Sequence, residues 1–311
     1  METSFKKSFS EKENACELLY ENLGPCYHLY TPENYEVIFV SEDDFKAGMT
    51  IMALCALISP DIRILTFQLM SNHIHSTAAG SEEACVAFFK SFRRRLQLYL
   101  KGKGRSLDLA AWDVSLRRTG SLKDLRTIIV YTNRNGFLVN PDETPFSYRW
   151  GANRLFFNPD SFALHSRSRE RLTVTHIRKT IHSGDYDRMA GLPMVDGYVS
   201  PLSFCDVRTA MGLSRDAHHY YHMASRDLES QQMLAKELGE SIYYTDNELY
   251  TAVVRYVGNK YGSLIPATLP KDAKLETARW MHYEYNAGNK QVSRILRLDR
   301  SVVDSMFPSG R

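Results

Sequence analysis

The sequence predicts an α+β fold with a mainly antiparallel sheet and packed helices, followed by an all-α C-terminal domain. Short aromatic and β-branched segments precede and separate amphipathic segments in the first half of the chain, and short loops join them. Beyond residue 200 almost every segment has helical periodicity. Because 311 residues exceed the usual length of one domain, we expect a first domain at 1–155, a connecting helical region at 156–230 and a helical C-terminal domain at 231–311.

Strands are predicted near the N-terminus, at 26–31 (CYHLYT) and 35–40 (YEVIFV), because aromatic and β-branched residues favour extended backbone. A Pro-Glu-Asn turn signal separates the two segments. The apolar residues that follow have helical spacing from 41 to about 58, with acidic residues in the first turn. Residues 62–74 then predict one long strand or a hairpin.

Two amphipathic helices are predicted after this segment. The first opens at Gly80-Ser81 and lines one face with four apolar or aromatic side chains, Phe88, Phe92, Leu96 and Tyr99. The second begins at an S-x-x-D capping box formed by Ser121 and Asp124. It should run to about Asn135, where Gly136 can end it.

Composition and cysteine usage are those of a globular protein in a reducing compartment. The chain is 43% hydrophobic and 24% charged. Its five cysteines form no C-x-x-C pair, which argues against a disulfide scaffold or a thiolate zinc site. No apolar stretch is long enough for a signal peptide or a membrane span. We therefore expect a cytoplasmic protein without a membrane partner.

Positive charge is concentrated in two parts of the chain, although the net charge is only +3. The segment 90–105 carries seven basic residues and no acidic one, namely Lys90, Arg93, Arg94, Arg95, Lys101, Lys103 and Arg105. From residue 271 onward, eight Lys and Arg stand against five Asp and Glu. Both parts predict contact with a polyanion, and Tyr99 and Trp112 are candidates for stacking on bases. The alternative is a solvated helix face.

Two histidines, His73 and His75, flank Ile74 at the end of a predicted strand. Alternate residues of a strand share a face, so both imidazoles should project to one side while Ile74 enters the core. Two imidazoles form half of a transition-metal site, which would need one or two further oxygen ligands. The alternative is a pair of half-exposed polar residues at a strand end.

A tyrosine lies near the end of the capped helix, in the segment IIVYTNRNG. Tyr131 and Asn135 lie one turn apart and share a face, with Arg134 adjacent. A phenol next to a carboxamide and a guanidinium is unusual for a core position. A half-buried tyrosine with a solvated hydroxyl is the alternative.

The order of these motifs resembles one known family. MSNHIH (70–75) is similar to the L-M-P-N-H-[hydrophobic]-H signature of HUH-superfamily single-tyrosine transposases. YTNRNGFLVN (131–140) is similar to the Y-I-x-x-N-P-x-x-[AG] segment of their REP-associated tyrosine transposase branch. CYHLYT, the Arg-rich helix after the histidines and PFSYRWG (145–151) match further family segments in the same order. The resemblance covers most of residues 26–150.

This resemblance implies a ferredoxin-like or RRM-like sheet, the HUH endonuclease fold. It also implies metal-dependent cleavage and rejoining of single-stranded DNA through a 5′-phosphotyrosine intermediate. Tyr131 would be the nucleophile, while His73, His75 and Asn135 would bind a divalent metal, Mg or Mn. The expected partners are single-stranded and hairpin DNA, contacted by the basic segment and by Arg134, and the protein would be a monomer or a homodimer associated with the nucleoid.

The C-terminal segment VSRILRLDRSVVDSMF (292–307) has the apolar spacing of a helix-turn-helix near 289–307. It resembles the I-A-x-x-L-G-[apolar]-S-x-x-x-V pattern of bacterial DNA-binding modules, with Arg297 in place of the turn glycine. A helix-turn-helix would direct one set of side chains to DNA, with Arg294 at phosphate and Arg300, Ser301, Asp304 and Ser305 in the major groove. A generic helical hairpin is the alternative.

The leading interpretation is therefore a transposase-like DNA endonuclease and strand transferase. A catalytically silent DNA-binding regulator derived from such an enzyme is the alternative, and a replication-initiation or mobilisation nuclease would share the same chemistry. A second cluster, His218, His219 and His222, could chelate a metal through its i,i+4 pair, but it lacks the glutamate of the H-E-x-x-H motif.

Overall fold

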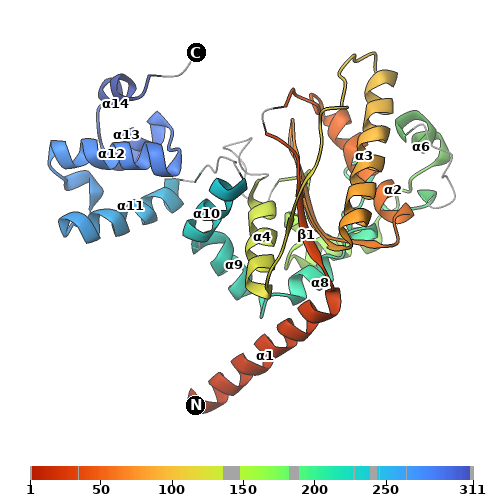
Figure 1. Cartoon of the computed structure of the whole chain (residues 1–311), viewed down its shortest axis with the longest axis horizontal. Helices are drawn as coiled ribbons and strands as arrows, with labels where there is room; N and C mark the ends of the chain where they lie inside the picture. The colour runs from red at the N-terminus through yellow and green to blue at the C-terminus, as the bar shows by residue number, and fades with distance from the viewer. Residues whose placement is uncertain are drawn as a thin grey trace. The chain divides into compact units, whose positions relative to one another are not determined.

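The computed structural model describes residues 2–33, 35–135, 148–181, 189–226, 228–238, 244, 246–263 and 265–308 (Figure 1). The chain divides into two compact units, Met1–Ala224 and Ser225–Arg311. Each unit has a hydrophobic core of its own. This division differs from the predicted domain end at 155, because residues 156–224 share the first core.

A four-stranded antiparallel sheet organises the first unit, in the order β2-β3-β1-β4. Its strands are β1 (Cys26–Tyr30), β2 (Ile62–Leu69), β3 (Ile74–Gly80) and β4 (Ser115–Arg118). The antiparallel sheet with its helices confirms the predicted α+β class. Of the two alternatives for 62–74, the hairpin is correct, but its second strand only begins at Ile74 and extends to Gly80. The predicted strand at 35–40 is wrong. That segment has irregular backbone, and the amides of Ile38 and Phe39 both donate to the Ser71 carbonyl.

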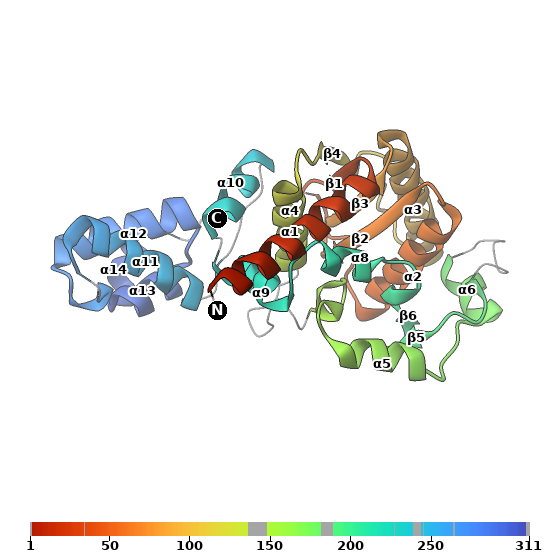
Figure 2. The same ribbon diagram turned by 90° about the horizontal axis from the view of Figure 1, so that it is seen from below.

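Helices cover both faces of this sheet (Figures 1 and 2). On one face lie α2 (Glu42–Ile58) and α3 (Glu82–Gly102), and on the other lies α4 (Leu122–Asn135). The four predicted face residues of α3, Phe88, Phe92, Leu96 and Tyr99, are all buried, as expected. The predicted cap of α4 forms in part, since the amide of Asp124 donates to Ser121 Oγ at 3.2 Å, while the Asp124 carboxylate accepts from Gly120.

The N-terminal helix α1 (Glu2–Leu23) is tied to α4 by an ion pair. Arg126 of α4 donates to both carboxylate oxygens of Glu13, at 2.6 and 3.2 Å, and its Nε donates to the Leu213 carbonyl at 2.6 Å. The same carboxylate accepts from Arg215 at 3.1 Å. One buried guanidinium thus joins α1, α4 and the end of α8 (Val207–Gly212).

Two segments that follow α4 in the chain supply hydrogen-bond partners for the backbone of β2 at its outer edge. The amide of Leu69 donates to the Trp150 carbonyl at 2.8 Å, the amide of Ala152 to Phe67 at 3.0 Å, and the amide of Asp206 to Ile64 at 2.7 Å. A strand edge leaves backbone groups that need partners, and segments on both sides of residue 155 supply them. The elements after this point are α5 (Pro159–Arg167), α6 (Val174–Ile181), β5 (Met194–Val195), β6 (Tyr198–Val199), α8 and α9 (Ala217–Arg226).

The second unit is helical, as predicted for the C-terminal part. It contains α10 (Leu228–Leu238), α11 (Asp246–Tyr261), α12 (Lys271–Tyr285), α13 (Asn289–Leu296) and α14 (Arg300–Met306). Of the apolar residues predicted for the helix-turn-helix, Leu298 in the turn is partly buried, and the others are buried in the core, namely Val292, Ile295, Leu296, Val303 and Phe307. Arg297 ends α13 with φ 49° and ψ 49°, so an arginine adopts the left-handed conformation that glycine usually supplies.

Two general expectations can be compared with the described residues. All five cysteines are buried free thiols, in agreement with the predicted absence of a disulfide scaffold. In the described ranges, no helix combines the length and the apolar character needed to cross a bilayer.

Candidate active site

The sheet has one apolar face and one polar face, and the polar face lies against α4. Phe67, Leu69 and Ile74 belong to the apolar core. The alternate positions carry polar side chains that contact α4. Thr66 Oγ1 donates to Asn133 Oδ1, Gln68 Nε2 donates to the Asn133 carbonyl at 3.1 Å, and the hydroxyls of Thr77 and Thr132 lie 3.1 Å apart. Burying such groups costs free energy unless they are hydrogen-bonded. These hydrogen bonds satisfy the buried polar groups and attach α4 to the sheet.

Three imidazoles and one phenol meet on this polar face. The rings of His73 and His75 are 5.0 Å apart at 88° to each other. The Tyr131 ring lies edge-on to His75 at 5.9 Å and to His28 at 6.0 Å. The structure thus brings the predicted Tyr131, His73 and His75 together, with Ile74 in the core between the two histidines as expected.

All four rings are buried. Tyr131 is 2% exposed, His73 is 8% exposed, and His28 and His75 are 0% exposed. Burial disfavours the charged imidazolium, so it lowers the pKa of His28 to about 3 and that of His73 to about 4. Burial, together with its two neighbouring histidines, holds the pKa of His75 well below its usual range. All three imidazoles are therefore neutral at pH 7, the form in which histidine binds metals. At 2% exposure, Tyr131 is not accessible to a substrate in this structure.

The residues after Tyr131 on α4 divide between two roles. The Asn135 amide nitrogen donates to the Tyr131 carbonyl at 3.4 Å, which leaves its carboxamide oxygen as the candidate metal ligand. Asn133 accepts from Thr66 and donates to Tyr220 of α9 at 2.7 Å, so it fixes the helix against the sheet and α9. Arg134, predicted to contact DNA, is instead buried and donates to the Ala224 carbonyl at 3.0 Å.

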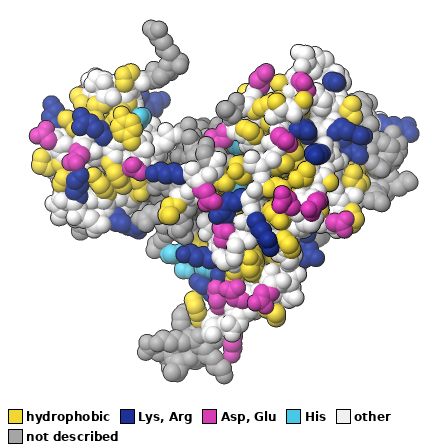
Figure 3. Space-filling view, in the orientation of Figure 1, with side chains coloured by type: hydrophobic (Ala, Val, Ile, Leu, Met, Phe, Trp, Pro, Cys, Tyr) yellow, Lys and Arg dark blue, Asp and Glu magenta, His cyan; other side chains and the backbone are white. Residues whose placement is uncertain are grey.

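The basic segment 90–105 also divides into exposed and structural members. Lys90, Arg94, Lys101 and Lys103 are exposed, and Figure 3 shows Lys and Arg side chains over α3. Arg95 is half-buried. Arg93 donates to the Ala110 and Trp112 carbonyls, and Arg105 donates to the carbonyls of Val37 and Ile38. Arg93 and Arg105 therefore hold loops in place, which the charge pattern alone does not reveal.

The two aromatic residues expected to stack on bases are core residues. Trp112 is fully buried, and its indole nitrogen donates to the Asn72 carbonyl at 3.2 Å. Tyr99 is buried, and its hydroxyl donates to Asp44 at 2.9 Å. Both expectations are wrong, because each ring completes the packing between α3 and its neighbours instead of facing solvent.

In the second unit, the side chains predicted to contact DNA are largely exposed but engaged with neighbours. Arg300 Nε donates to both oxygens of Asp304, at 2.8 and 2.9 Å, and Arg294 pairs with Asp246 at 2.9 Å. Asp299 caps α14, and its carboxylate accepts from both the amide and the hydroxyl of Ser301. The Ser305 hydroxyl donates to the Val302 carbonyl at 2.7 Å. DNA would have to compete for both arginines.

The imidazole group fits a divalent cation in one respect. His73 Nε2 is buried and has no hydrogen-bond partner among the described residues, as an atom reserved for a ligand would be. In the same described ranges, no group of three or more His, Cys, Asp or Glu side chains that could hold a metal ion is found. His218, His219 and His222 are among these residues and form no such group. A site of two imidazoles and one Asn oxygen would have a different composition.

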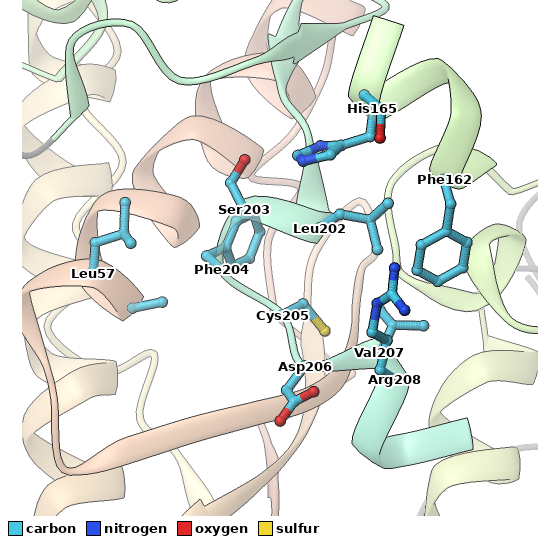
Figure 4. A pocket seen from close by; sticks show the side chains of 12 residues that line it. Leu57, Phe162, His165, Leu202, Ser203, Phe204, Cys205, Asp206, Val207 and Arg208 are labelled. Carbon is cyan, nitrogen blue, oxygen red and sulfur yellow. The ribbon is translucent and has the colours of Figure 1, made fainter. Parts of the chain in front are cut away.

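Two cavities of the first unit lie away from the candidate site. One of about 450 Å³ is lined by residues of α2, α5 and the segment 202–208, among them His165, Ser203 and Arg208 (Figure 4). Another of about 320 Å³ lies between α1 and α9 and includes the HHYYH histidines. Neither is lined by Tyr131 or by the three clustered imidazoles.

Two members of the candidate site were not identified as site residues from the sequence. His28 is adjacent to His75, with its Nε2 3.2 Å from His75 Nδ1, and Asn72 contacts His73. Period-two alternation in CYHLYT could have placed His28 on one face of its strand. The strand pairing that sets His28 opposite Thr77 and Tyr30 opposite His75 comes only from the structure.

Comparisons with known proteins add no further information. No family model matches the chain, and no curated protein or solved structure matches it either.

Proposed function

We propose that the first unit is an HUH-type, transposase-like enzyme that nicks and rejoins single-stranded DNA through Tyr131. The observation that carries the proposal is the packing of the Tyr131 ring against His75, beside a second and perpendicular imidazole, His73. A buried cluster of neutral imidazoles beside a phenol is typical of a reaction centre.

The proposed reaction exchanges one phosphodiester for another. Tyr131 Oη forms a bond to phosphorus while the bond between phosphorus and the 3′-oxygen breaks. The phenol proton ends on the released 3′-hydroxyl, and the 5′-phosphate stays on the tyrosine. Because the bond is conserved, a 3′-hydroxyl of another strand can reverse the step without ATP. The reaction therefore supports joining as well as cutting.

His73, His75 and Asn135 would hold a divalent ion, Mg or Mn, beside this tyrosine. When bound, the ion would neutralise charge on the phosphoryl oxygens as a Lewis acid. The neutral state of both imidazoles at pH 7 suits this role, because a protonated imidazole has no lone pair for a metal. Asn135 would contribute its carboxamide oxygen, since its amide nitrogen is engaged with the Tyr131 carbonyl.

Exposed basic residues of α3 would hold the DNA strand, and the second unit would recognise duplex or hairpin DNA through α13 and α14. Lys101 and Lys103 are exposed, whereas Arg105 is tied to two backbone carbonyls. The affinity should fall with rising salt, so a plot of log affinity against log salt has a negative slope. We expect a double change of Lys101 and Lys103 to Ala to make this slope less steep by about 1 to 2. Fluorescence anisotropy with a labelled single strand at several salt concentrations measures this slope, and an unchanged slope would exclude both lysines from the DNA contact.

A catalytically silent DNA-binding regulator is the second candidate. The 2% exposure of Tyr131 favours it, because a nucleophile that never meets solvent cannot attack DNA. The two candidates differ in whether DNA binding uncovers the phenol.

Covalent trapping distinguishes the two. The protein is incubated with single-stranded hairpin DNA from its own genomic flanks and Mg²⁺ or Mn²⁺, then separated under denaturing conditions. We expect a protein–DNA adduct that Tyr131→Phe abolishes. Tyr27→Phe is the matched control, because Tyr27 is a buried tyrosine of β1. An adduct that persists in Tyr131→Phe would refute the nucleophile, and binding without an adduct would favour the regulator.

A further inference from the structure

The two histidines among the candidate metal ligands each have a polar partner on the same ring nitrogen, Nδ1. His73 Nδ1 lies 2.8 Å from Asn72 Oδ1, and His75 Nδ1 lies 3.2 Å from His28 Nε2. In metal sites, a histidine that binds through one nitrogen usually donates its other N–H to such a partner, which fixes the ring and its tautomer.

The tautomer of His73 follows from the other bonds of Asn72. The Asn72 amide nitrogen donates to the Tyr35 carbonyl at 3.2 Å and to the Glu33 carbonyl. Because that nitrogen is occupied, the side-chain atom facing His73 is the oxygen, which can only accept. His73 Nδ1 must therefore carry the proton and donate it. The lone pair of His73 then lies on Nε2, which is buried without a hydrogen-bond partner in the described chain.

The contact between His28 and His75 permits two tautomer pairs. If His28 donates, the His75 proton lies on Nε2, and that nitrogen cannot bind a cation. If His75 donates from Nδ1, its lone pair lies on Nε2, as in His73. The stacked geometry, with ring planes 10° apart, allows either arrangement. Only the second makes the two candidate ligands chemically alike.

We infer that His28 and Asn72 are positioning residues, which accept hydrogen bonds from the Nδ1–H groups of His75 and His73 so that both histidines present Nε2 to one divalent cation. This inference rests on the proposed function and adds a role for two residues that would touch neither the DNA nor the ion. Asn72 and His28 then have the same role, since each fixes the ring orientation and the tautomer of one histidine ligand. Asn72 precedes the histidine pair in the sequence, whereas His28 reaches it across the sheet.

Metal affinity tests the role of His28 without reference to cleavage. Mn²⁺ binding to the full chain is measured by the electron paramagnetic resonance signal of free Mn²⁺. We expect His28→Phe, which keeps a ring in this buried space, to weaken binding 10-fold to 100-fold. We expect His28→Gln to stay within about threefold of the wild type, because its amide oxygen can still accept from His75. Thr77→Val is the control for a merely structural effect, since it removes a buried hydroxyl opposite His28 in the strand register.

The outcomes separate this inference from the proposed function. Equal Mn²⁺ affinity in the wild type and in His28→Phe would overturn the role of His28. It would not bear on the proposed function, which the Tyr131 adduct tests separately. Equal weakening in Thr77→Val would reduce His28 to a packing residue and overturn the inference. A wild type that binds no Mn²⁺ would overturn the metal site and this inference together.

A second measurement determines the tautomer directly. Long-range ¹H–¹⁵N correlation spectra of histidine-labelled protein, with Zn²⁺ as a diamagnetic substitute, locate the ring protons. We expect the protons of His73 and His75 on Nδ1. A proton on Nε2 of His75 would overturn the inference, even if the variants lose affinity.

Discussion

Replacing Glu13 by Gln should destabilise the first unit, because it leaves a buried guanidinium without its counter-ion. The Arg126 side chain is 7% exposed and Glu13 is 29% exposed. The change removes the negative charge and replaces one carboxylate oxygen by an amide nitrogen. At most one of the two hydrogen bonds from Arg126, at 2.6 and 3.2 Å, then persists, and the 3.1 Å contact with Arg215 weakens. Removing one partner of a fully buried pair costs about 3–5 kcal/mol. The partial exposure of Glu13 reduces this, so we expect a loss of about 2–3 kcal/mol.

The effect should also depend on pH with a definite sign. The Arg126 hydrogen bond, supported by Arg215, holds the pKa of the Glu13 carboxyl below its usual value of 4.5. A depressed carboxyl pKa stabilises the folded state above the unfolded pKa, and this contribution is lost as pH falls through the folded pKa. The difference in unfolding free energy between wild type and Glu13→Gln should therefore be full at pH 7 and shrink below about pH 4.

Urea unfolding followed by circular dichroism at pH 7 and at pH 3.5 measures both effects. The matched control is Glu17→Gln, one turn further along α1, where the side chain is exposed. We expect this control to change stability by less than about 0.5 kcal/mol. The reasoning is refuted if both variants have the same stability, or if the loss in Glu13→Gln is as large at pH 3.5 as at pH 7.

Three further predictions test other contacts. Tyr220→Phe removes the hydroxyl that accepts from Asn133 at 2.7 Å and donates to Asn153 at 2.6 Å. We expect the free energy of unfolding in urea to fall by about 2–3 kcal/mol, and a fall below about 1 kcal/mol would contradict the importance of these two hydrogen bonds. Gly151→Ala would bring a methyl group to 2.7 Å from a carbonyl of β2, so its melting temperature should fall, whereas Gly120→Ala, with no atom within 4 Å, should be nearly neutral. Arg297→Gly should stabilise the second unit by about 0.5–1 kcal/mol because it relieves the left-handed backbone, while Arg294→Gly within α13 should destabilise it by about 1 kcal/mol. Shifts of the same sign in these two arginine variants would contradict that explanation.

Local patterns in the sequence were sufficient for much of the secondary structure. The spacing of Phe88, Phe92, Leu96 and Tyr99 predicted the buried face of α3, and the S-x-x-D motif predicted the start of α4. These features depend on residues three or four positions apart, whose contacts are fixed once the helix forms. The pairing of His73 and His75 on one side of Ile74 had the same local origin.

Exposure and partnership were decided by the tertiary structure. A run of basic residues does not show that Arg105 holds a loop, or that Arg134 is buried against α9. The segment 35–40 has strand propensity, but β4 occupies the edge position beside β1. Two backbone amides of the segment, those of Ile38 and Phe39, donate instead to the Ser71 carbonyl. The propensity of a segment says nothing about which sheet edge remains open to it.

The sequence by itself determined the helices α2, α3 and α4 and the candidate residues Tyr131, His73 and His75, because each depends on periodicity or capping within one segment. The order of the segments and their short loops indicated the antiparallel sheet. Only the tertiary structure decided that His28 meets His75 and that residues 156–224 join the first core. Those contacts link positions far apart in the chain, and their geometry is set by strand register and by the unpaired edge of β2. Neither of these leaves a periodic signal in the sequence.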